Sequence, residues 1–318
     1  MRAALRVTIV LSVAAATPLL AQTSDCSPYG GTTRRVCDAA VDGTRAFHPV
    51  AGLLVSGGNP VLGTAGTLGG LGHFSVTVRG NAAQVVLPET GYDGSTTTVP
   101  ASDELFAPVP LLEAAAGIYG GMPSGLLAID LLLSAQLLPT DQIDNLAVAQ
   151  GARRLGDVAL GLGYGARVGV LSELGPVPAV SVSLMRRDIP ELAYGDIEEG
   201  DQYRYAVDLH ATNLRLVASK HLATLEVAAG LGWDKYTGDA VIQFRDPATS
   251  TVEPAIELEL DQSRALFFLD AGLDHRVVRL AGELGYQTGK DQELSTDFED
   301  FDTTSGKIFG SLGARVAF

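Results

Sequence analysis

Long apolar runs are missing from this 318-residue chain beyond its N-terminus. A transmembrane helix needs roughly 20 consecutive apolar residues. The nearest approach, residues 126–138, is interrupted by Asp130 and Gln136 and is followed by Pro139. A membrane location would therefore require a closed β-barrel, because only helices and closed barrels satisfy every backbone polar group in hydrocarbon.

Positive charge is also scarce, with 22 lysines and arginines against 37 aspartates and glutamates and a formal net charge of −15. Such an acidic chain is not expected to bind nucleic acid or to adsorb to anionic lipid head groups. The two cysteines, Cys26 and Cys37, are too few for a metal site, so no cofactor is expected. In an oxidising compartment, two cysteines this close are expected to form a disulfide.

The first 21 residues have the features of a secretory signal peptide. Arg2 and Arg6 form a basic start, residues 7–16 are apolar, and a small-residue cleavage site ends at Ala21. Cys26 is not set in the lipid-attachment motif of a lipoprotein. The chain is therefore expected to be exported, and cleavage would remove two arginines and leave a net charge of about −17.

Strand-like alternation is clearest in residues 155–189. One face of the first run is aliphatic or aromatic, and the other is mostly glycine with an occasional charge. Period two is the strand period. An apolar outer face opposite a small or polar inner face is typical of transmembrane barrel strands. The sequence therefore predicts an all-β fold, a transmembrane antiparallel barrel.

About ten strands can be placed in the barrel, which we assign to residues 71–318. They cover residues 71–87, 110–119, 125–138, 155–171, 177–188, 203–218, 221–236, 262–275, 277–290 and 304–318. Short turns alternate with long polar loops, as in outer-membrane barrels. A hairpin in residues 50–68 would raise the count to twelve, with fourteen as the upper limit. An even count predicts that both termini lie at the short-turn, periplasmic end.

Residues 22–70 are expected to form a separate N-terminal segment tied by Cys26 and Cys37. Apolar residues within 32–47 allow a short helix, and residues 50–70 alternate between glycine-rich and apolar stretches. This part of the segment could be a first hairpin or a plug in the lumen. As a whole, the segment would plug the barrel or cap its periplasmic mouth.

The C-terminal residues 308–318 end in Phe318 and keep the alternating period, which resembles the sorting signal of bacterial outer-membrane barrels. This resemblance implies the outer membrane of a Gram-negative-type bacterium, with its lipid and the barrel-assembly machinery as partners. More loosely, Gly57-Gly58-Asn59-Pro60 and the 155–187 hairpin resemble the fatty-acid transporter (FadL-like) barrels. That resemblance implies porin-like passive uptake of a small molecule, with hydrophobic ligands as the favoured class.

The phase of each strand predicts which charges line the lumen. In 203–218 we expect Tyr205, Val207 and Leu209 to face outward, followed by a bulge near Thr212 and Asn213 that inverts the phase. Arg204 is then expected opposite Asp234, and Asp270 opposite Arg279 rather than Glu283. The predicted lumen residues are Glu113, Asp130, Asp157, Arg167, Arg204, Asp208, His210, Glu226, Asp234, Asp270, Arg279, Glu283, Lys307 and Arg315.

These charges allow two interpretations: a structural network that fills a narrow lumen, or a polar pathway for a solute. The corresponding functions are uptake, and a sealed structural or surface-interaction barrel that transports nothing. The five histidines are scattered and none belongs to a recognisable serine–base motif, so no enzymatic activity is expected. The acidic run at 297–302 lacks the spacing of a calcium loop and is interpreted as solvated.

Overall fold

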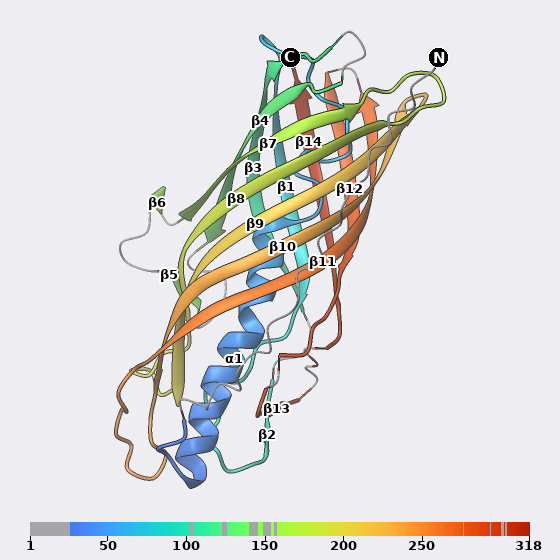
Figure 1. Ribbon diagram of the computed structural model, residues 1–318. Helices are drawn as coiled ribbons and strands as arrows, with labels where there is room; N and C mark the ends of the chain where they lie inside the picture. Colours follow the sequence, from blue (N-terminus) through green and yellow to red (C-terminus); the bar gives the residue numbers. More distant parts are fainter. Residues whose placement is uncertain are drawn as a thin grey trace, which may run out of the picture.

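The protein is described by a computed structural model, which covers residues 26–101, 105–122, 126–139, 146–148, 154–155, 158–275, 277–292, 294–299, 302 and 304–318. Ten antiparallel strands form one closed barrel (Figure 1), and the first of them, β1, pairs with the last, β14. The barrel strands are β1 (Phe74–Val85), β3 (Leu105–Tyr119), β4 (Ile129–Pro139), β7 (Val158–Leu171), β8 (Ala179–Tyr194), β9 (Tyr203–Leu222), β10 (Leu225–Phe244), β11 (Ile256–His275), β12 (Val278–Gln287) and β14 (Lys307–Ala317).

Four short strands lie at the long-loop end. β5 (Leu146–Val148) pairs antiparallel with the end of β8, and β6 (Arg154–Leu155) pairs antiparallel with the start of β7. β2 (Thr98–Val99) and β13 (Asp297–Phe298) form a separate parallel pair. The predicted all-β barrel of about ten strands is confirmed. The additional hairpin is wrong, because residues 50–56 end a helix and 57–68 form no strand.

The barrel wall has unequal height. β9, β10 and β11 have 20 residues each, whereas β12, β14 and β1 have 10, 11 and 12. The long strands therefore rise above the rest at the long-loop end as a curved wall. A lateral row of paired residues crosses this wall, Asp188 to His210 to Thr237 to Asp261, and their side chains point outward. We call this row the boundary rung, and it separates the short-turn half from the long-loop half.

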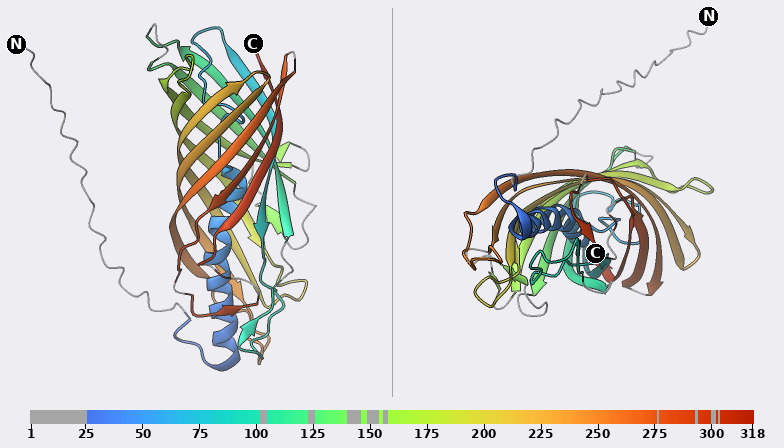
Figure 2. Two further views of the ribbon diagram at one scale, coloured as in Figure 1. Left: turned by 90° about the vertical axis from the view of Figure 1, so that its right-hand side faces the viewer. Right: turned by 90° about the horizontal axis from the view of Figure 1, so that it is seen from below.

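Helix α1 (Gly31–Ser56) lies inside the barrel, as the view along the axis in Figure 2 shows. It is longer than the helix expected within 32–47, because the apolar residues 50–55 continue it. The helix ends at Gly57, whose φ of 59° suits glycine, and the Gly57 amide donates to the Leu53 carbonyl. Among the described residues, the helices include none long and apolar enough to cross a membrane.

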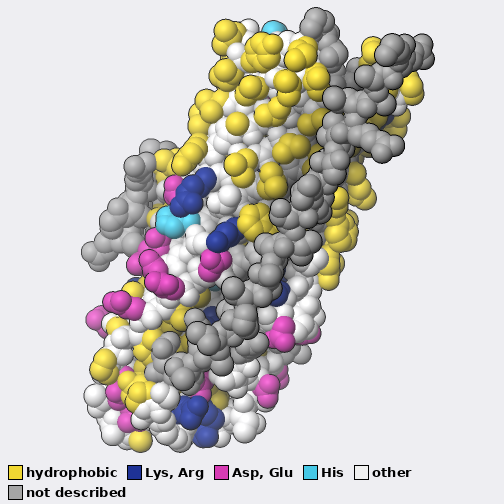
Figure 3. Space-filling view, in the orientation of Figure 1, with side chains coloured by type: hydrophobic (Ala, Val, Ile, Leu, Met, Phe, Trp, Pro, Cys, Tyr) yellow, Lys and Arg dark blue, Asp and Glu magenta, His cyan; other side chains and the backbone are white. Residues whose placement is uncertain are grey.

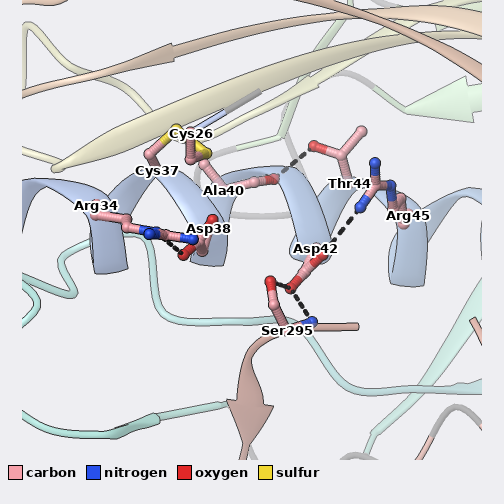
Figure 4. The surroundings of a disulfide bond; sticks show 9 residues. All are labelled: Cys26, Arg34, Cys37, Asp38, Ala40, Asp42, Thr44, Arg45 and Ser295. Atoms are coloured by element: carbon pink, nitrogen blue, oxygen red, sulfur yellow. Dashed lines mark hydrogen bonds and ion pairs between the residues drawn. A yellow bond between two sulfur atoms is a disulfide. The ribbon is translucent and has the colours of Figure 1, made fainter. Parts of the chain in front are cut away.

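The predicted disulfide between Cys26 and Cys37 is confirmed and ties the chain to the second turn of α1 (Figure 4). Around it the helix is fixed by side-chain contacts. Asp42 accepts hydrogen bonds from the backbone amide and the hydroxyl of Ser295, at 2.8 and 2.9 Å, which attach the loop before β13 to the helix. The start of α1 therefore belongs to a packed head at the long-loop end.

Candidate functional site

The candidate site is the barrel lumen, which the chain itself occupies. α1 and the irregular stretch 57–68 run along it, and we call residues 31–68 the lumenal segment. From Val50 to Ala65 every residue of this segment is buried. Two small cavities beside α1 have volumes of only 10 and 20 Å³, room for no more than about one water molecule each.

Acidic side chains of the barrel bind backbone amides of the lumenal segment. Glu283 on β12 accepts from Gly58 at 3.0 Å and from Asn59 at 2.5 Å. Asp270 on β11 accepts from Gly63 at 3.2 Å. Asp130 on β4 accepts from the Leu68 amide at 3.2 Å, and Ser219 from that of Ala65 at 2.9 Å.

Arginines and asparagines of the barrel bind the carbonyls of the same segment. Arg215 on β9 donates to Gly57 and Gly58 at 2.8 and 2.7 Å. Arg79 on β1 donates to Asn59 at 2.7 Å. Asn81 donates to the Leu54 carbonyl at 3.0 Å, and Arg315 makes a longer contact with that of Leu62, at 3.5 Å. The barrel thus recognises this stretch largely through its main chain, and satisfies polar groups that burial would otherwise leave unpaired.

Ion pairs hold most of the lumen arginines in place. Arg215 lies 2.6 Å from Asp234, which also accepts from Asn213 and Tyr236 at 2.6 and 2.8 Å. Arg187 donates to Asn213. Similar pairs link Arg167 to Asp130 at 2.7 Å, Arg79 to Glu113 at 3.4 Å, and Arg279 to Glu226. Each of these charges has an opposite charge beside it, as burial in a low-dielectric interior requires.

Glycine is needed where the segment touches the wall. A β-carbon on Gly58 would lie 2.5 Å from a Glu283 carboxylate oxygen, and one on Gly57 would lie 2.5 Å from Arg79 Nη2. Gly57 also has a positive φ. The close approach of the backbone to both charged groups therefore depends on glycine at these two positions.

Above the boundary rung the interior is apolar. Tyr205, Val207 and Leu209 of β9, with Ile242 and Phe244 of β10, are buried against α1 and line the inside of the long-loop half. Most outward residues there are polar or charged, such as Asp208, Asp239 and Glu259, although Val241 is exposed, whereas the outer face of the short-turn half is a broad apolar band (Figure 3). The same strands therefore have opposite polarity in the two halves.

Most predicted lumen charges do face inward. Seven are buried in the lumen: Glu113, Asp130, Arg167, Glu226, Asp234, Asp270 and Glu283. Arg279 and Arg315 reach Glu226 and Leu62 near the short-turn end. Lys307 borders the 20 Å³ cavity beside Val50 of α1. Asp157 lies outside the described residues.

Three predicted lumen residues, Arg204, Asp208 and His210, are corrected by the structure. They lie on the outer face, and the His210 ring is 2.8 Å from Asp188 on the outward boundary rung. The predicted bulge near Thr212 is also wrong, because β9 keeps one register with both neighbours through this region. The inversion of polarity reflects a change of surroundings, since α1 packs against the inner face above the rung.

Two predicted cross-strand pairs are wrong. Asp234 lies opposite Asn213 and not Arg204, while Arg204 lies opposite Gln243. Asp270 lies opposite Glu283, and Arg279 lies opposite Asp274. Two acidic side chains can be neighbours in the lumen because each accepts backbone amides from the lumenal segment.

The sequence interpretation missed several residues of this network. Arg79, Asn81, Arg187, Asn213 and Arg215 all contact the lumenal segment or its ion pairs. The available signal was their position among small residues on the polar face of an alternating strand. Asn59 was noted only in a glycine-rich motif, yet its side chain donates to Asp270 at 2.5 Å.

Shallow depressions mark the outer face. One of about 660 Å³ is lined by leucines around Gly282, where the wall also includes Ala281 and Gly313. Another of about 390 Å³ lies between β3, β4 and β7. Among the described residues, no group of three or more histidine, cysteine or acidic side chains is placed to hold a metal ion.

Among the carboxylates outside the barrel wall whose pKa is lowered, two link separate elements of the fold. Hydrogen bonds from Lys220 and His221 lower the pKa of Glu173, in the β7–β8 turn, to about 2. At the opposite end, the backbone amide of Ala248 and the Thr33 hydroxyl lower the pKa of Asp246. The second contact, 2.9 Å long, joins the first turn of α1 to the β10–β11 loop.

No protein-family model and no curated protein sequence matches this chain. Solved structures that are similar to it are outer-membrane β-barrels. The translocator domain of autotransporter NalP from Neisseria meningitidis is 12% identical over 87% of this chain and 98% of that one, with a TM-score of 0.41. OmpT, an outer membrane protease from Escherichia coli, is 10% identical over 77% of this chain and 96% of that one, with a TM-score of 0.36. The CymD monoaromatic hydrocarbon channel is 13% identical over 78% of this chain and 89% of that one, with a TM-score of 0.32.

Proposed function

We propose that this chain is an outer-membrane β-barrel whose lumen is sealed by its own N-terminal segment, so that it acts at the cell surface without an open channel. A membrane position is supported by the apolar band around the short-turn half. Leu231, Leu269 and Leu284 on that band are 62%, 65% and 65% exposed. Such exposure would be unfavourable in water and is expected where strands face lipid.

The single observation that carries the seal is the binding of residues 54–68 by side chains of seven strands. Six of these strands bind main-chain groups of the stretch, and β10 binds the Thr64 hydroxyl. Side chains of β1, β4, β9, β10, β11, β12 and β14 contact this stretch. Its displacement would leave buried arginines and carboxylates without their backbone partners, which is costly in a low-dielectric interior. The lumen charges therefore serve as a structural network and not as a solute path.

Uptake of a small hydrophobic molecule, the function suggested by the FadL-like resemblance, is the second candidate. The depression at Gly282 favours it, because a lateral route would need a thin wall there. A β-carbon on Gly63 of the lumenal segment would lie 2.8 Å from Ala281 Cβ, and one on Gly313 would lie 3.1 Å from Leu62. At this point little besides backbone separates the membrane side of the wall from residues 62–63.

Planar-bilayer conductance tests the seal against uptake along the lumen past a movable plug. A protease site inserted after Leu71, which is 80% exposed, would allow cleavage of the link between the lumenal segment and β1 in the folded protein. A sealed barrel keeps the cleaved segment bound and stays non-conducting. A movable plug releases it, and a steady current appears.

Two controls accompany this experiment. The same site placed after Thr249, in the β10–β11 loop, should leave the protein non-conducting under either function. Deletion of residues 22–60 should give a current if a barrel still forms, as judged by heat-dependent gel mobility. A current from the uncut full-length protein would contradict the seal outright.

A further inference from the structure

The lumenal segment runs in one direction through the barrel, and its first residues lie at the long-loop end. The Tyr29 ring packs on Phe244, the last residue of β10, with ring centroids 5.1 Å apart. Thr33 donates to Asp246 in the following loop at 2.9 Å. Arg35 donates to the Gly94 carbonyl in the β1–β3 connection at 2.5 Å.

The other end of the segment lies at the short-turn end. The His73 carbonyl accepts from the Gly117 amide near the end of β3, at 2.9 Å. Phe74, the first residue of β1, exchanges two backbone hydrogen bonds with Phe318, the last residue of the chain. The N-terminus, which the sequence places with the C-terminus at the short-turn end, lies outside the described residues. The first described residues lie at the long-loop end, opposite Phe318, where the blue end of α1 is drawn in Figure 1.

The length of the segment is sufficient to cross a membrane inside the barrel. A 26-residue helix is about 39 Å long, and residues 57–73 continue toward the short turns. The hydrocarbon core of a bilayer is about 30 Å thick. The long-loop half, whose outer face is mostly polar (Figure 3), stands beyond the apolar band on the side where α1 begins (Figure 1).

The segment is also retained from both sides of the seam where the barrel closes. Arg79 on β1 binds the Asn59 carbonyl. Glu283 on β12 binds the Asn59 amide and accepts from Ser311 of β14 at 3.1 Å. Sideways release would therefore require the β1–β14 seam to open and these contacts to break.

We propose that the lumen carries the N-terminal end of this chain outward, so that the disulfide-tied head at Cys26–Cys37 is presented on the outer face of the cell. The proposal rests on the membrane position given above and adds a role: the barrel is a holder that displays a polypeptide end. A peptide joined ahead of Cys26 would be displayed with it. The main-chain contacts in the lumen anchor the displayed end, and the disulfide and the helix packing give it a fixed shape.

Surface labelling of intact cells tests this proposal. The full chain would be produced in a Gram-negative host with one epitope tag in three alternative positions: directly before Cys26, after Thr249 in the β10–β11 loop, or after Gly175 in the β7–β8 turn. We expect antibody binding and complete loss of the tag on external protease treatment for the first two. The third should be reached only after permeabilisation.

The outcomes separate the two proposals. A tag before Cys26 that stays protected while the Thr249 tag is reached would overturn the display of the N-terminus and leave the membrane barrel intact. If antibody and protease reach the Gly175 tag but not the Thr249 tag, the barrel has the opposite orientation in the membrane. That result would overturn the display as well. Protection of all three tags in a protein that does not fractionate with outer membrane would contradict the membrane position itself.

A single substitution provides a second test of the proposal if an inserted tag prevents folding. Ser27 is exposed beside the disulfide, and Ser27→Lys adds an amine to the head. An amine reagent too large for general diffusion pores should label this new amine and the exposed Lys290 on intact cells. It should not label Lys220 at the short-turn end. Labelling of Lys290 without labelling of the amine introduced by Ser27→Lys would overturn the proposal.

Discussion

The two halves of the barrel use opposite chemistry on the same strands. In the short-turn half of β10, Leu231 faces outward and Asp234 inward, whereas in the long-loop half Asp239 faces outward and Ile242 inward. The strand does not change phase between them. The difference shows that side-chain polarity in this protein follows what lies on each side of the wall. Below the boundary rung the inner face meets a polar segment and the outer face, on the proposed membrane position, meets lipid. Above the rung the inner face meets a helix and the outer face would meet water.

The largest effect on stability is expected when a charged lumen residue of the short-turn half is replaced by an apolar one. Arg215→Met would leave Asp234 buried without its cation, and the Gly57 and Gly58 carbonyls without donors. Loss of one partner of a buried ion pair costs about 3–5 kcal/mol, and urea unfolding in lipid vesicles would measure it. The matched substitution in the long-loop half, Leu209→Met, conserves an apolar side chain and should cost less than about 1.5 kcal/mol.

The double variant Arg215→Met with Asp234→Leu sharpens this test. Removing both charges should recover part of the lost free energy of unfolding, because no uncompensated charge remains buried. The two carbonyls still lack donors, so recovery is incomplete. Equal effects of Arg215→Met and Leu209→Met would contradict the distinction between the halves.

The next largest effect on stability is expected for an arginine introduced on the outer face of the barrel. Leu231→Arg places a charge near the middle of the apolar band and should destabilise the barrel by about 2–4 kcal/mol. Val241→Arg is on the same face of the same strand but above the boundary rung, where we expect about 0.5 kcal/mol or less. Folding yield into vesicles and urea unfolding both report the difference. Equal tolerance of the two arginines would mean that the band does not face lipid.

Removal of the disulfide should affect the long-loop half alone. Cys26→Ala with Cys37→Ala opens a loop with a sequence separation of 11, and such cross-links contribute about 2–3 kcal/mol. We expect faster amide exchange in the first turns of α1 and no change below the boundary rung. Hydrogen exchange resolved by peptide would show this. Faster exchange at Gly57 and Gly58 as well would contradict the independence of the two halves.

The sequence predicts the short-turn half well because period-two alternation is strong there. An apolar outer residue beside glycine or a charge defines the strand, and ten such runs correspond to the ten barrel strands, although the sequence also allowed twelve or fourteen. The same rule fails above the boundary rung. It predicts that Tyr205, Val207 and Leu209 face outward, because nothing in a single strand reveals that α1 packs behind it.

The predicted register between β11 and β12 is also wrong, because the turn between these strands is placed incorrectly. The predicted turn at Asp274 and His275 falls two residues before the observed one, since His275 pairs with Val278. That shift puts Asp270 opposite Glu283. The backbone amides of Gly58, Asn59 and Gly63 bind these two carboxylates and make their close approach favourable. Because these residues lie far away in the chain, the sequences of β11 and β12 alone do not predict that Asp270 and Glu283 are neighbours.

The smallest effect on stability is expected for a solvent-accessible ion pair, in contrast to the buried pairs of the lumen. Glu173 at the short-turn end lies 2.8 Å from Lys220 and 2.6 Å from His221, and these contacts lower its pKa from the ordinary value of 4.5 to about 2. The folded state therefore favours the ionised carboxylate. Its contribution to stability is present above pH 4.5 and is lost as the pH falls toward 2.

Glu173→Gln should consequently lower the unfolding free energy slightly at neutral pH, and the difference from wild type should vanish near pH 2. Solvent screens this accessible pair, so the loss should be far below that of Arg215→Met. Urea titrations at a series of pH values measure the difference, and in a Lys220→Gln background it should shrink. A difference that persists unchanged to the lowest pH would show that the carboxylate charge is not what holds the β7–β8 turn against β9.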